Sequence, residues 1–413
     1  MSTDTIVPSI PDLSDPAGFA SEVPHEAFDA IRQMPGLYWQ PAKAGTLNGG
    51  FWCITRHADI AEIERNPEVF SSRWGPFFPT LPAPHNEFSR NIMYNDPPDH
   101  SRLRRAAARS FGPRVIANFD TWVREIVVEV LEDITDRGEV NWIDDVAAII
   151  PSRVIARVIG VPHHDRQRIV DWTLAIFDAA EKPNGGESML MLLPEIHSYL
   201  EQLRTDKLRD PQDDFATVLA RCVERGEISQ PEFLAYLILL LIAGFETTHT
   251  VIAQAMRLIL EDSQVADVTG RAIDGGSLDG LVDEFLRYVT PAMNMARTVT
   301  RDVDFHGTQM REGDLVQMFF TAANRDPVVF ADPHRFDPFR TGNEHMSFGN
   351  GPHHCIGKNL ARLELRILFE EMHRRGVLVA LNGEPRRGWS TFINKLLSMP
   401  VTVTMADRQE ARP

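Results

Sequence analysis

Apolar residues recur with helical spacing over most of this chain and alternate as in strands only in short stretches. The segments with helical periodicity are 26–33, 116–141, 147–208, 231–262, 281–288 and 359–371. Residues 37–39 and 50–55 are typical of strands, and a short helical pattern follows at 56–65. We therefore predict a mainly α fold with a small β-rich subdomain.

The domain organisation follows from the absence of any stretch rich enough in Pro, Gly or Ser to act as a linker. We expect a single domain over residues 26–404, preceded by an N-terminal extension (1–25) and followed by a C-terminal tail (405–413). The chain has 413 residues, of which 43% are hydrophobic and 24% charged, and this composition is typical of a globular protein with a large core.

Charge and cysteine usage exclude several classes of function. The net charge of −16 argues against nucleic-acid binding. Three distant cysteines do not form a disulfide framework, so we expect a reducing, cytoplasmic environment. The polar residues 1–15 resemble no signal sequence. The longest apolar run, Leu237 to Phe245, is shorter than the roughly 20 residues that span a bilayer, so we expect no membrane association.

The long helical segment 231–262 carries an unusual group of residues after its apolar run. Ala243-Gly244-Phe245-Glu246-Thr247-Thr248 places a glycine, a carboxyl group and two hydroxyls in mid-helix. Glycine there costs about 1 kcal/mol relative to alanine, and a buried carboxylate costs more unless it is satisfied. Stability therefore explains this group poorly, and proton transfer offers a chemical reason for it.

A second group of residues surrounds Cys355, in a glycine-rich loop just before the helical pattern at 359–371. Free N–H groups at a helix start stabilise a thiolate, which is a good axial ligand for iron. Two alternatives remain open at this point: a buried structural cysteine and a zinc site with His353 and His354. Adjacent histidines do not easily converge on one metal.

The loop resembles the haem-binding loop of cytochrome P450s, which is Phe, two residues, Gly, one residue, His or Arg, one residue, Cys, one residue, Gly. Phe348, Gly351, His353, Cys355 and Gly357 fill every position of that pattern. The resemblance implies a cytochrome P450 fold that binds haem b (iron protoporphyrin IX), with Cys355 as the iron ligand. It also implies that Phe348 packs near the sulfur and that His353 reaches a haem propionate.

The helix 231–262 is similar to the oxygen-binding helix of the same family, whose pattern is Ala/Gly-Gly-x-Asp/Glu-Thr-Thr. The resemblance gives Gly244 a place beside the haem, Glu246 a role in proton delivery and Thr247 a role in oxygen activation. In the same way it assigns His100, Arg104 and Arg297 to the haem propionates.

Three charged residues match the family's structural motifs. Glu284 and Arg287 lie three apart in one helical pattern, and Arg335 lies downstream in His334-Arg335-Phe336. The resemblance implies that Glu284, Arg287 and Arg335 form a charge network that holds the cysteine loop, with no catalytic role.

The substrate pocket is expected from two sources. Between Ser71 and Ile92, bulky apolar residues alternate with prolines that exclude a regular helix. This segment, with others that pass near the haem in the family, predicts pocket positions at Trp74, Phe77, Phe78, Phe88, Ala243, Ala292, Met293, Asn294, Met295, Phe392 and Ile393.

The implied activity is insertion of one atom of O₂ into a small apolar substrate, with electrons from a ferredoxin and its NAD(P)H-dependent reductase. Four aromatic rings would narrow the pocket, so we expect hydroxylation or epoxidation of a compact terpenoid or alkyl-aromatic molecule. A steroid or long-chain lipid is the alternative substrate. The alternatives of another kind are a peroxide-using or isomerising P450-fold enzyme and a non-catalytic haem sensor or electron carrier.

Overall fold

The computed structural model describes residues 10–42, 45–78, 89–181 and 185–406, with the side chains of 174 and 176–190 excepted. Its helices are α1 (His25–Gln33), α2 (His57–Glu64), α3 (Asp99–Ala108), α4 (Pro113–Ala117), α5 (Asp120–Arg137), α6 (Ile149–Ile159), α7 (Arg166–Glu181), α8 (Gly185–Arg209), α9 (Phe215–Glu224), α10 (Gln230–Glu261), α11 (Ser263–Asp274), α12 (Leu278–Val289), α13 (Phe320–Ala323) and α14 (Lys358–Arg375). The mainly α fold predicted from the apolar pattern is confirmed.

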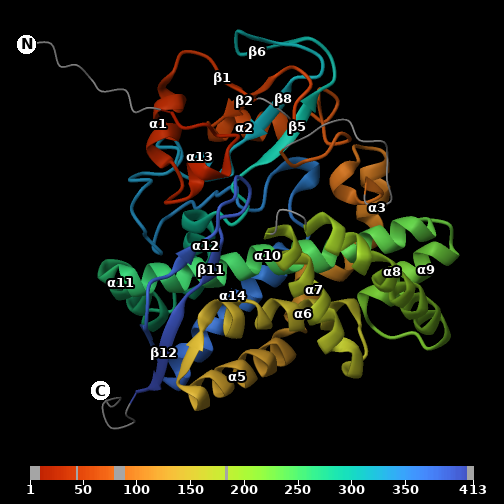
Figure 1. Ribbon diagram of the computed structural model, residues 1–413, viewed down its shortest axis with the longest axis vertical. Coiled ribbons are helices and arrows are strands. Elements are labelled where there is room, and N and C mark those ends of the chain that lie inside the picture. The colour runs from red at the N-terminus through yellow and green to blue at the C-terminus, as the bar shows by residue number, and fades with distance from the viewer. Residues whose placement is uncertain (1–9, 43–44, 79–88, 182–184, 407–413) are drawn as a thin grey trace, which may run out of the picture.

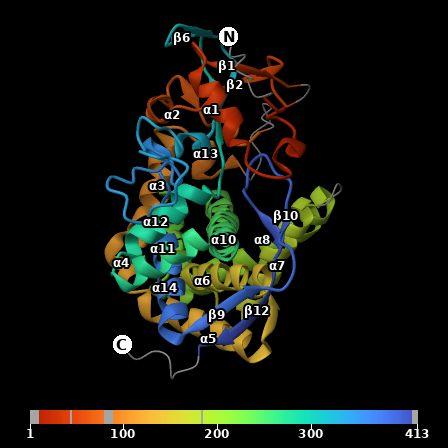
Figure 2. The same ribbon diagram turned by 90° about the vertical axis from the view of Figure 1, so that its left-hand side faces the viewer.

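In the part of the chain that the structure describes, the strands form four small sheets, of which the five-stranded one lies at one end of the molecule and the one with β12 (Pro400–Met405) lies near α5 at the other end (Figure 1). A mostly antiparallel sheet has the order β1 (Tyr38–Pro41), β2 (Gly50–Ile54), β8 (Leu315–Met318), β5 (Met295–Val299) and β3 (Phe70–Ser71), with β2 parallel to β8. The other strands are β4 (Glu139–Asn141), β6 (Val303–Phe305), β7 (Thr308–Met310), β9 (Val377–Leu381), β10 (Arg386–Arg387) and β11 (Leu396–Ser398). In both views the five-stranded sheet lies at one end of the molecule, together with α1 and α2 (Figures 1 and 2).

Helix α10 forms the centre of the helical part. It begins with a capping box, in which Ser229 accepts from the Glu232 N–H and Glu232 accepts from the Ser229 N–H. Of the helices that the structure describes, α10 is the one long and apolar enough to cross a membrane, but it packs inside the core against α6, α12 and α14. Its continuous apolar run therefore reflects burial against neighbouring helices.

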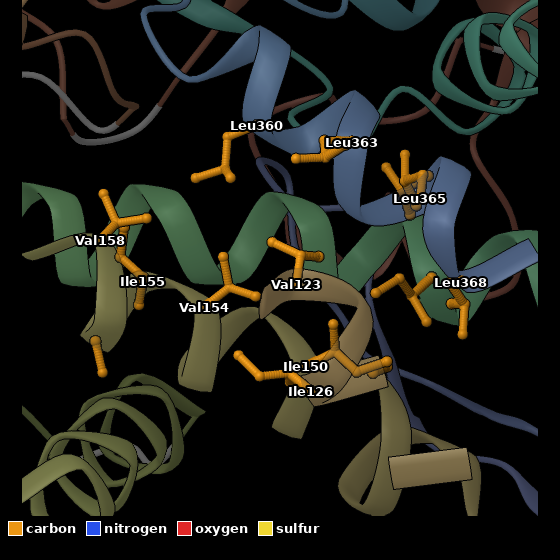
Figure 3. Close-up of a cluster of buried hydrophobic side chains, with 14 of the residues drawn as sticks. Val123, Ile126, Ile150, Val154, Ile155, Val158, Leu360, Leu363, Leu365 and Leu368 are labelled. Carbon is orange, nitrogen blue, oxygen red and sulfur yellow. The ribbon is translucent and has the colours of Figure 1, made fainter. Parts of the chain in front are cut away.

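Figure 3 shows how α10 is enclosed. Aliphatic side chains of α14 reach it from one side, and side chains of α5 and α6 reach it from the other. The labelled residues of this cluster are Val123, Ile126, Ile150, Val154, Ile155, Val158, Leu360, Leu363, Leu365 and Leu368. Because α14 begins just after Cys355, this packing fixes the loop of residues 348–357 relative to α10.

Candidate active site

A large cavity separates the middle of α10 from the loop of residues 348–357, which we call the Cys loop. The empty space in and around it, which includes open solvent at its mouth, is about 1440 Å³. Of the residues predicted as functional, those that line it are His100, Arg104, Ala243, Gly244, Thr247, Ala292, Met295, Arg297, Phe348, His353, Cys355 and Gly357. The structure thus gathers residues from α3, α10, β5 and the Cys loop around one space.

The Cys loop holds Cys355 at the wall of this cavity. The Cys355 N–H donates to the Phe348 carbonyl at 2.8 Å, which closes the loop. Gly351 has φ 62°, and a Cβ there would lie 2.4 Å from the Glu64 carbonyl oxygen, so this position requires glycine. The loop is therefore pressed directly against the end of α2.

The sulfur of Cys355 has an environment that suits a metal ligand. Burial raises the pKa of the Cys355 thiol, while the N–H groups of Gly357 and Lys358 and the cations Arg104 and Lys358 act against that rise. A buried thiolate is therefore stable here chiefly when a positive partner such as a metal ion binds it. The ring of Phe348 lines the cavity on the same side, and the Arg362 guanidinium lies 4.8 Å from its centre.

Opposite the Cys loop, α10 presents small and hydroxyl-bearing residues. The Thr247 hydroxyl donates to the Ala243 carbonyl at 3.2 Å, one turn earlier. Ala243, Gly244, Thr247 and Thr248 line the cavity, whereas Glu246 is not among its lining residues. The helix is continuous through this stretch, so the motif does not break it.

Gly244 has a packing role that the sequence did not reveal. A Cβ at Gly244 would lie 2.8 Å from Cδ1 and 3.1 Å from Cγ1 of Ile155 on α6. The glycine therefore allows α6 and α10 to approach closely beside the cavity, in addition to leaving space within it. Figure 3 shows Ile155 at this crossing.

One end of the cavity is rich in histidine and arginine. The rings of His100 and His353 lie 4.2 Å apart, and Arg297 is 4% exposed. Burial, followed by the charge of Arg297, lowers the pKa of His353 to about 2. Burial, followed by the charge of Arg104, lowers the pKa of His100 to about 4. Both rings are therefore neutral at physiological pH.

His100 indicates what this end of the cavity is suited to bind. It is 1% exposed, and neither of its ring nitrogens has a hydrogen-bond partner among the described residues. Buried polar atoms are normally paired, so an unpaired ring beside Arg297 fits the carboxylates of a bound group. The thiol, the apolar walls and this polar end together match the chemistry of haem.

Arg104 makes a contact in addition to its predicted role at a haem propionate. Its Nη2 donates at 2.6 Å to the carbonyl oxygen of His354, the residue just before Cys355. It also lines the cavity. Arg104 thus ties α3 to the Cys loop in this structure, a contact that the spacing of His100 and Arg104 on one helical face did not predict.

The predicted charge network needs one correction. Glu284 and Arg287 form a fully buried bidentate pair, with N–O distances of 2.8 and 2.7 Å. Arg335, however, is exposed and contributes its backbone carbonyl, which accepts from Arg287 at 3.1 Å. The second cation near Glu284 is Arg340, at 3.7 Å. A carbonyl suffices because the Arg287 guanidinium already carries the neutralising charge.

Several predicted pocket residues lie outside the cavity wall. Trp74 is 39% exposed, and Phe78 packs on Phe51 of β2 at 5.2 Å between ring centres. Phe77 packs on Phe392 at 4.8 Å. None of the predicted rings Trp74, Phe77, Phe78 and Phe392 is among the lining residues, and Phe88 lies outside the described residues. The aromatic segment therefore packs largely onto its surroundings.

The segment 292–295 divides between pocket and core. Ala292 and Met295 line the cavity, whereas Met293 is buried in a separate apolar cluster. Asn294 offers no polar group to the cavity, because its amide donates to the Thr391 carbonyl at 2.6 Å and its oxygen accepts from Gln317. Ile393 is buried and forms a bridge with Ala292, and so supports the wall from behind.

Sequence reasoning missed two buried carboxyl groups that line the cavity, Glu64 and Glu364. Each has an oxygen without a partner among the described residues. Glu364 interrupts the apolar face of α14 between Leu360 and Leu368. The helical periodicity of the sequence could therefore have indicated that this carboxyl group is buried. Glu64 ends α2 in a segment without any motif.

The chain is similar to known proteins over most of its length. The family model for cytochrome P450 matches residues 277–375. The methyl-branched lipid omega-hydroxylase of Mycobacterium bovis (strain ATCC BAA-935 / AF2122/97) is 32% identical over 381 residues, covering 90% of this chain and 89% of that protein. The steroid C26-monooxygenase of Rhodococcus jostii (strain RHA1) is 29% identical over 409 residues, with coverage of 95% and 85%.

Two further similarities agree with this. The linalool 8-monooxygenase of Pseudomonas putida is 28% identical over 411 residues, covering 95% of this chain and 98% of that protein. The crystal structure of P450 OxyD, involved in the biosynthesis of vancomycin-type antibiotics, superimposes with a TM-score of 0.85 at 27% identity, covering 96% and 100% of the two chains. With the thiol loop, the α10 motif and the buried Glu284–Arg287 pair in their expected places, the chain belongs to the cytochrome P450 family and is a haem-thiolate monooxygenase.

Proposed function

We propose that this monooxygenase oxidises an apolar, branched aliphatic molecule of the terpenoid class. The observation that carries the proposal is the character of the cavity wall around Thr247. Ala243 and Val251 of α10, one turn before and one turn after Thr247, line the cavity together with Ala292 and Met295, and none of these four side chains is aromatic or charged. Such a wall binds an aliphatic chain by burial alone, with no charged anchor.

The predicted narrowing of the pocket by bulky rings, from which both a compact terpenoid and an alkyl-aromatic substrate were expected, has no support in the cavity wall, because Trp74, Phe77 and Phe78 are not lining residues. The terpenoid proposal therefore rests on the aliphatic residues of the wall alone. The aliphatic wall fits a branched chain at least as well as a compact ring. We therefore keep the terpenoid part of the prediction.

Cys355 is the residue that we expect to bind the haem iron, with Phe348 packed against the haem on the same side. Haem supplies the activation of O₂ and the one-electron chemistry when it is bound. We assign to Thr247 the hydroxyl that positions a proton on the distal side, because it lines the cavity opposite Cys355. We assign to Glu246 the delivery of protons from solvent toward that hydroxyl.

The polar end of the cavity would hold the haem carboxylates. Arg297 supplies the buried positive charge, and the neutral rings of His100 and His353 supply N–H donors. One ring nitrogen of His353, Nε2, lies 3.2 Å from the Ser72 hydroxyl. This contact fixes the ring orientation and leaves its second nitrogen for a ligand.

The substrate proposal is tested by titrating three probes into the haem-loaded protein and following the spin-state shift of the haem band. The probes are linalool, a methyl-branched fatty acid and a steroid with its aliphatic side chain. We expect the terpenoid to bind, and we expect Ala292→Leu to weaken its binding because the added atoms fill the aliphatic wall. Met191→Leu is the control, because Met191 is exposed on the surface.

A steroid or long-chain lipid is the second candidate, and the similarities favour it. Two of the relatives described above act, by their names, on a steroid and on a methyl-branched lipid. A saturating spin shift with the steroid or the branched fatty acid, and none with linalool, would replace the terpenoid proposal by this one.

We propose a ferredoxin with its NAD(P)H-dependent reductase as electron donor, in the cytoplasm. Arg109 and Arg114 are exposed close to the start of α14, where Asn359 donates to the Phe111 carbonyl at 3.3 Å. These cations suit an acidic donor. Reduction by a ferredoxin system that slows steeply with added salt supports the assignment, and equal rates at low and high salt would contradict it.

A further inference from the structure

A carboxyl group that no motif marks lies beside the polar end of the cavity. Glu64 is the last residue of α2, its side chain is 2% exposed, and it lines the cavity. One of its oxygens lies 3.8 Å from Nη2 of Arg297, the buried cation expected to meet a haem carboxylate. The other oxygen, Oε2, has no hydrogen-bond partner in the part of the chain that the structure describes.

Glu64 lies in close contact with the Cys loop. The Asn350 N–H acts against the rise in the pKa of its carboxyl group. A Cβ at Gly349 would lie 3.2 Å from its Oε1, and a Cβ at Gly351 would lie 2.4 Å from its backbone oxygen. The loop that carries Cys355 therefore passes directly over this carboxyl, and the side chain is 2% exposed.

A charged Glu64 would compete with the haem for the same cation. Arg297 has the Ala296 carbonyl and Glu64 as its nearest partners in the structure. A second carboxylate, from the haem, would place two like charges around one guanidinium in a buried site. The repulsion between two carboxylates in such a site is removed when one of them takes up a proton.

We propose that Glu64 is a proton-binding residue coupled to the haem: its carboxyl shares Arg297 with a haem carboxylate, takes up one proton from solvent when the haem accepts one electron from its donor, and releases it when the electron leaves. The inference rests on the haem assignment and not on any substrate. The electron adds negative charge near the carboxyl, and the proton removes a negative charge from it, so the charge of the site is conserved.

The titration range of Glu64 agrees with this role. Burial raises the pKa of Glu64 to about 7, against the opposing charge of Arg297 and the Asn350 N–H. The charged groups that act on Glu64 are Arg297 on β5 and Arg65, which follows α2. Around Arg297 and the two histidine rings lie Asp96 before α3, His100 and Arg104 on α3, and His353 on the Cys loop. The pKa values of His100, about 4, and His353, about 2, lie below the neutral range, so these rings do not titrate there.

The test is the midpoint reduction potential of the haem-loaded protein between pH 5.5 and 8.5. Protonation stabilises the reduced state, so we expect the wild-type potential to rise as the pH falls through about 7. Glu64→Gln should remove most of this dependence. Glu62→Gln is the matched control, because Glu62 is on the same helix but 55% exposed and paired with His306 at the surface; it should keep the wild-type dependence.

A second readout is the rate at which haem passes to an excess of a haem-scavenging protein. At pH 8.5 Glu64→Gln should lose haem several-fold more slowly than wild type, since the competing charge is gone, and at pH 5.5 the two rates should agree. A wild-type potential that does not change with pH overturns the proposal without any variant. A Glu64→Gln protein with the wild-type pH dependence overturns it as well, while a normal thiolate spectrum in both proteins would leave the haem assignment intact.

Discussion

The Arg104 guanidinium donates to the carbonyl oxygen of His354 at 2.6 Å, so the helix α3 is bound to the residue immediately before Cys355. The same cation also lowers the pKa of the Cys355 thiol against the effect of burial. A single side chain therefore stabilises both the position and the charge of the sulfur.

This contact predicts that Arg104→Ala loosens the Cys loop. A hydrogen bond from a charged donor contributes about 1.5–3 kcal/mol, so part of the protein should lose thiolate ligation and show an unshifted band in the reduced, CO-bound spectrum. Arg104→Lys should rescue part of the shifted band. Arg105→Ala, on the exposed face of the same helix, is the control. A full shifted band in Arg104→Ala would show that the contact does not hold the loop.

The close approach of α6 to α10 predicts coupling between Gly244 and Ile155. Gly244→Ala gains roughly 1 kcal/mol of helix propensity but overpacks against Ile155, at a cost of about 1–3 kcal/mol. In an Ile155→Val background, which removes Cδ1, the same substitution should be neutral or stabilising. Urea unfolding of the four proteins gives the interaction free energy, and additive effects would contradict the packing role of Gly244.

The position of Thr247 on the cavity wall predicts an uncoupling variant. Thr247→Ala should keep haem and substrate binding, but the yield of product per NAD(P)H should fall at least roughly tenfold as electrons pass to peroxide. Thr247→Ser, which keeps the hydroxyl, should restore much of the yield. The measurement compares NAD(P)H consumed, product and peroxide formed; unchanged coupling in Thr247→Ala would remove this residue from oxygen activation.

The buried Glu284–Arg287 pair predicts a sharp contrast with Arg335. Arg287→Ala leaves Glu284 uncompensated and also removes donors to the carbonyls of Asn324 and Pro333, so it should cost about 3–5 kcal/mol in free energy of unfolding. Arg335→Ala keeps the backbone carbonyl that Arg287 uses and should stay within about 0.5 kcal/mol of wild type. Equal destabilisation by the two variants would restore the Arg335 side chain to the network.

Long elements with a strong apolar period were predictable from the sequence. The segments expected at 231–262 and 359–371 correspond to α10 (Gln230–Glu261) and α14 (Lys358–Arg375). The Cys loop was predictable as well, because Cys355 and the residues around it follow a fixed spacing that the geometry of the loop requires.

Other features depend on contacts that spacing does not record. Arg335 could not be distinguished from Arg340, because the network uses a backbone carbonyl of one and the side chain of the other. The aromatic segment was expected to face the haem, but Phe78 packs against Phe51 on β2. Glu64 had no local signal, since its role arises only where the end of α2 meets the Cys loop and β5.

The reduced, CO-bound absorption spectrum of the purified protein tests the central claim most directly. We expect a strongly red-shifted Soret band, because Cys355 ligates the haem iron as a thiolate, and Cys355→Ala should abolish it. A Soret band of the ordinary histidine type in the wild-type protein, or the shifted band retained in Cys355→Ala, would contradict the assignment of Cys355 as the ligand.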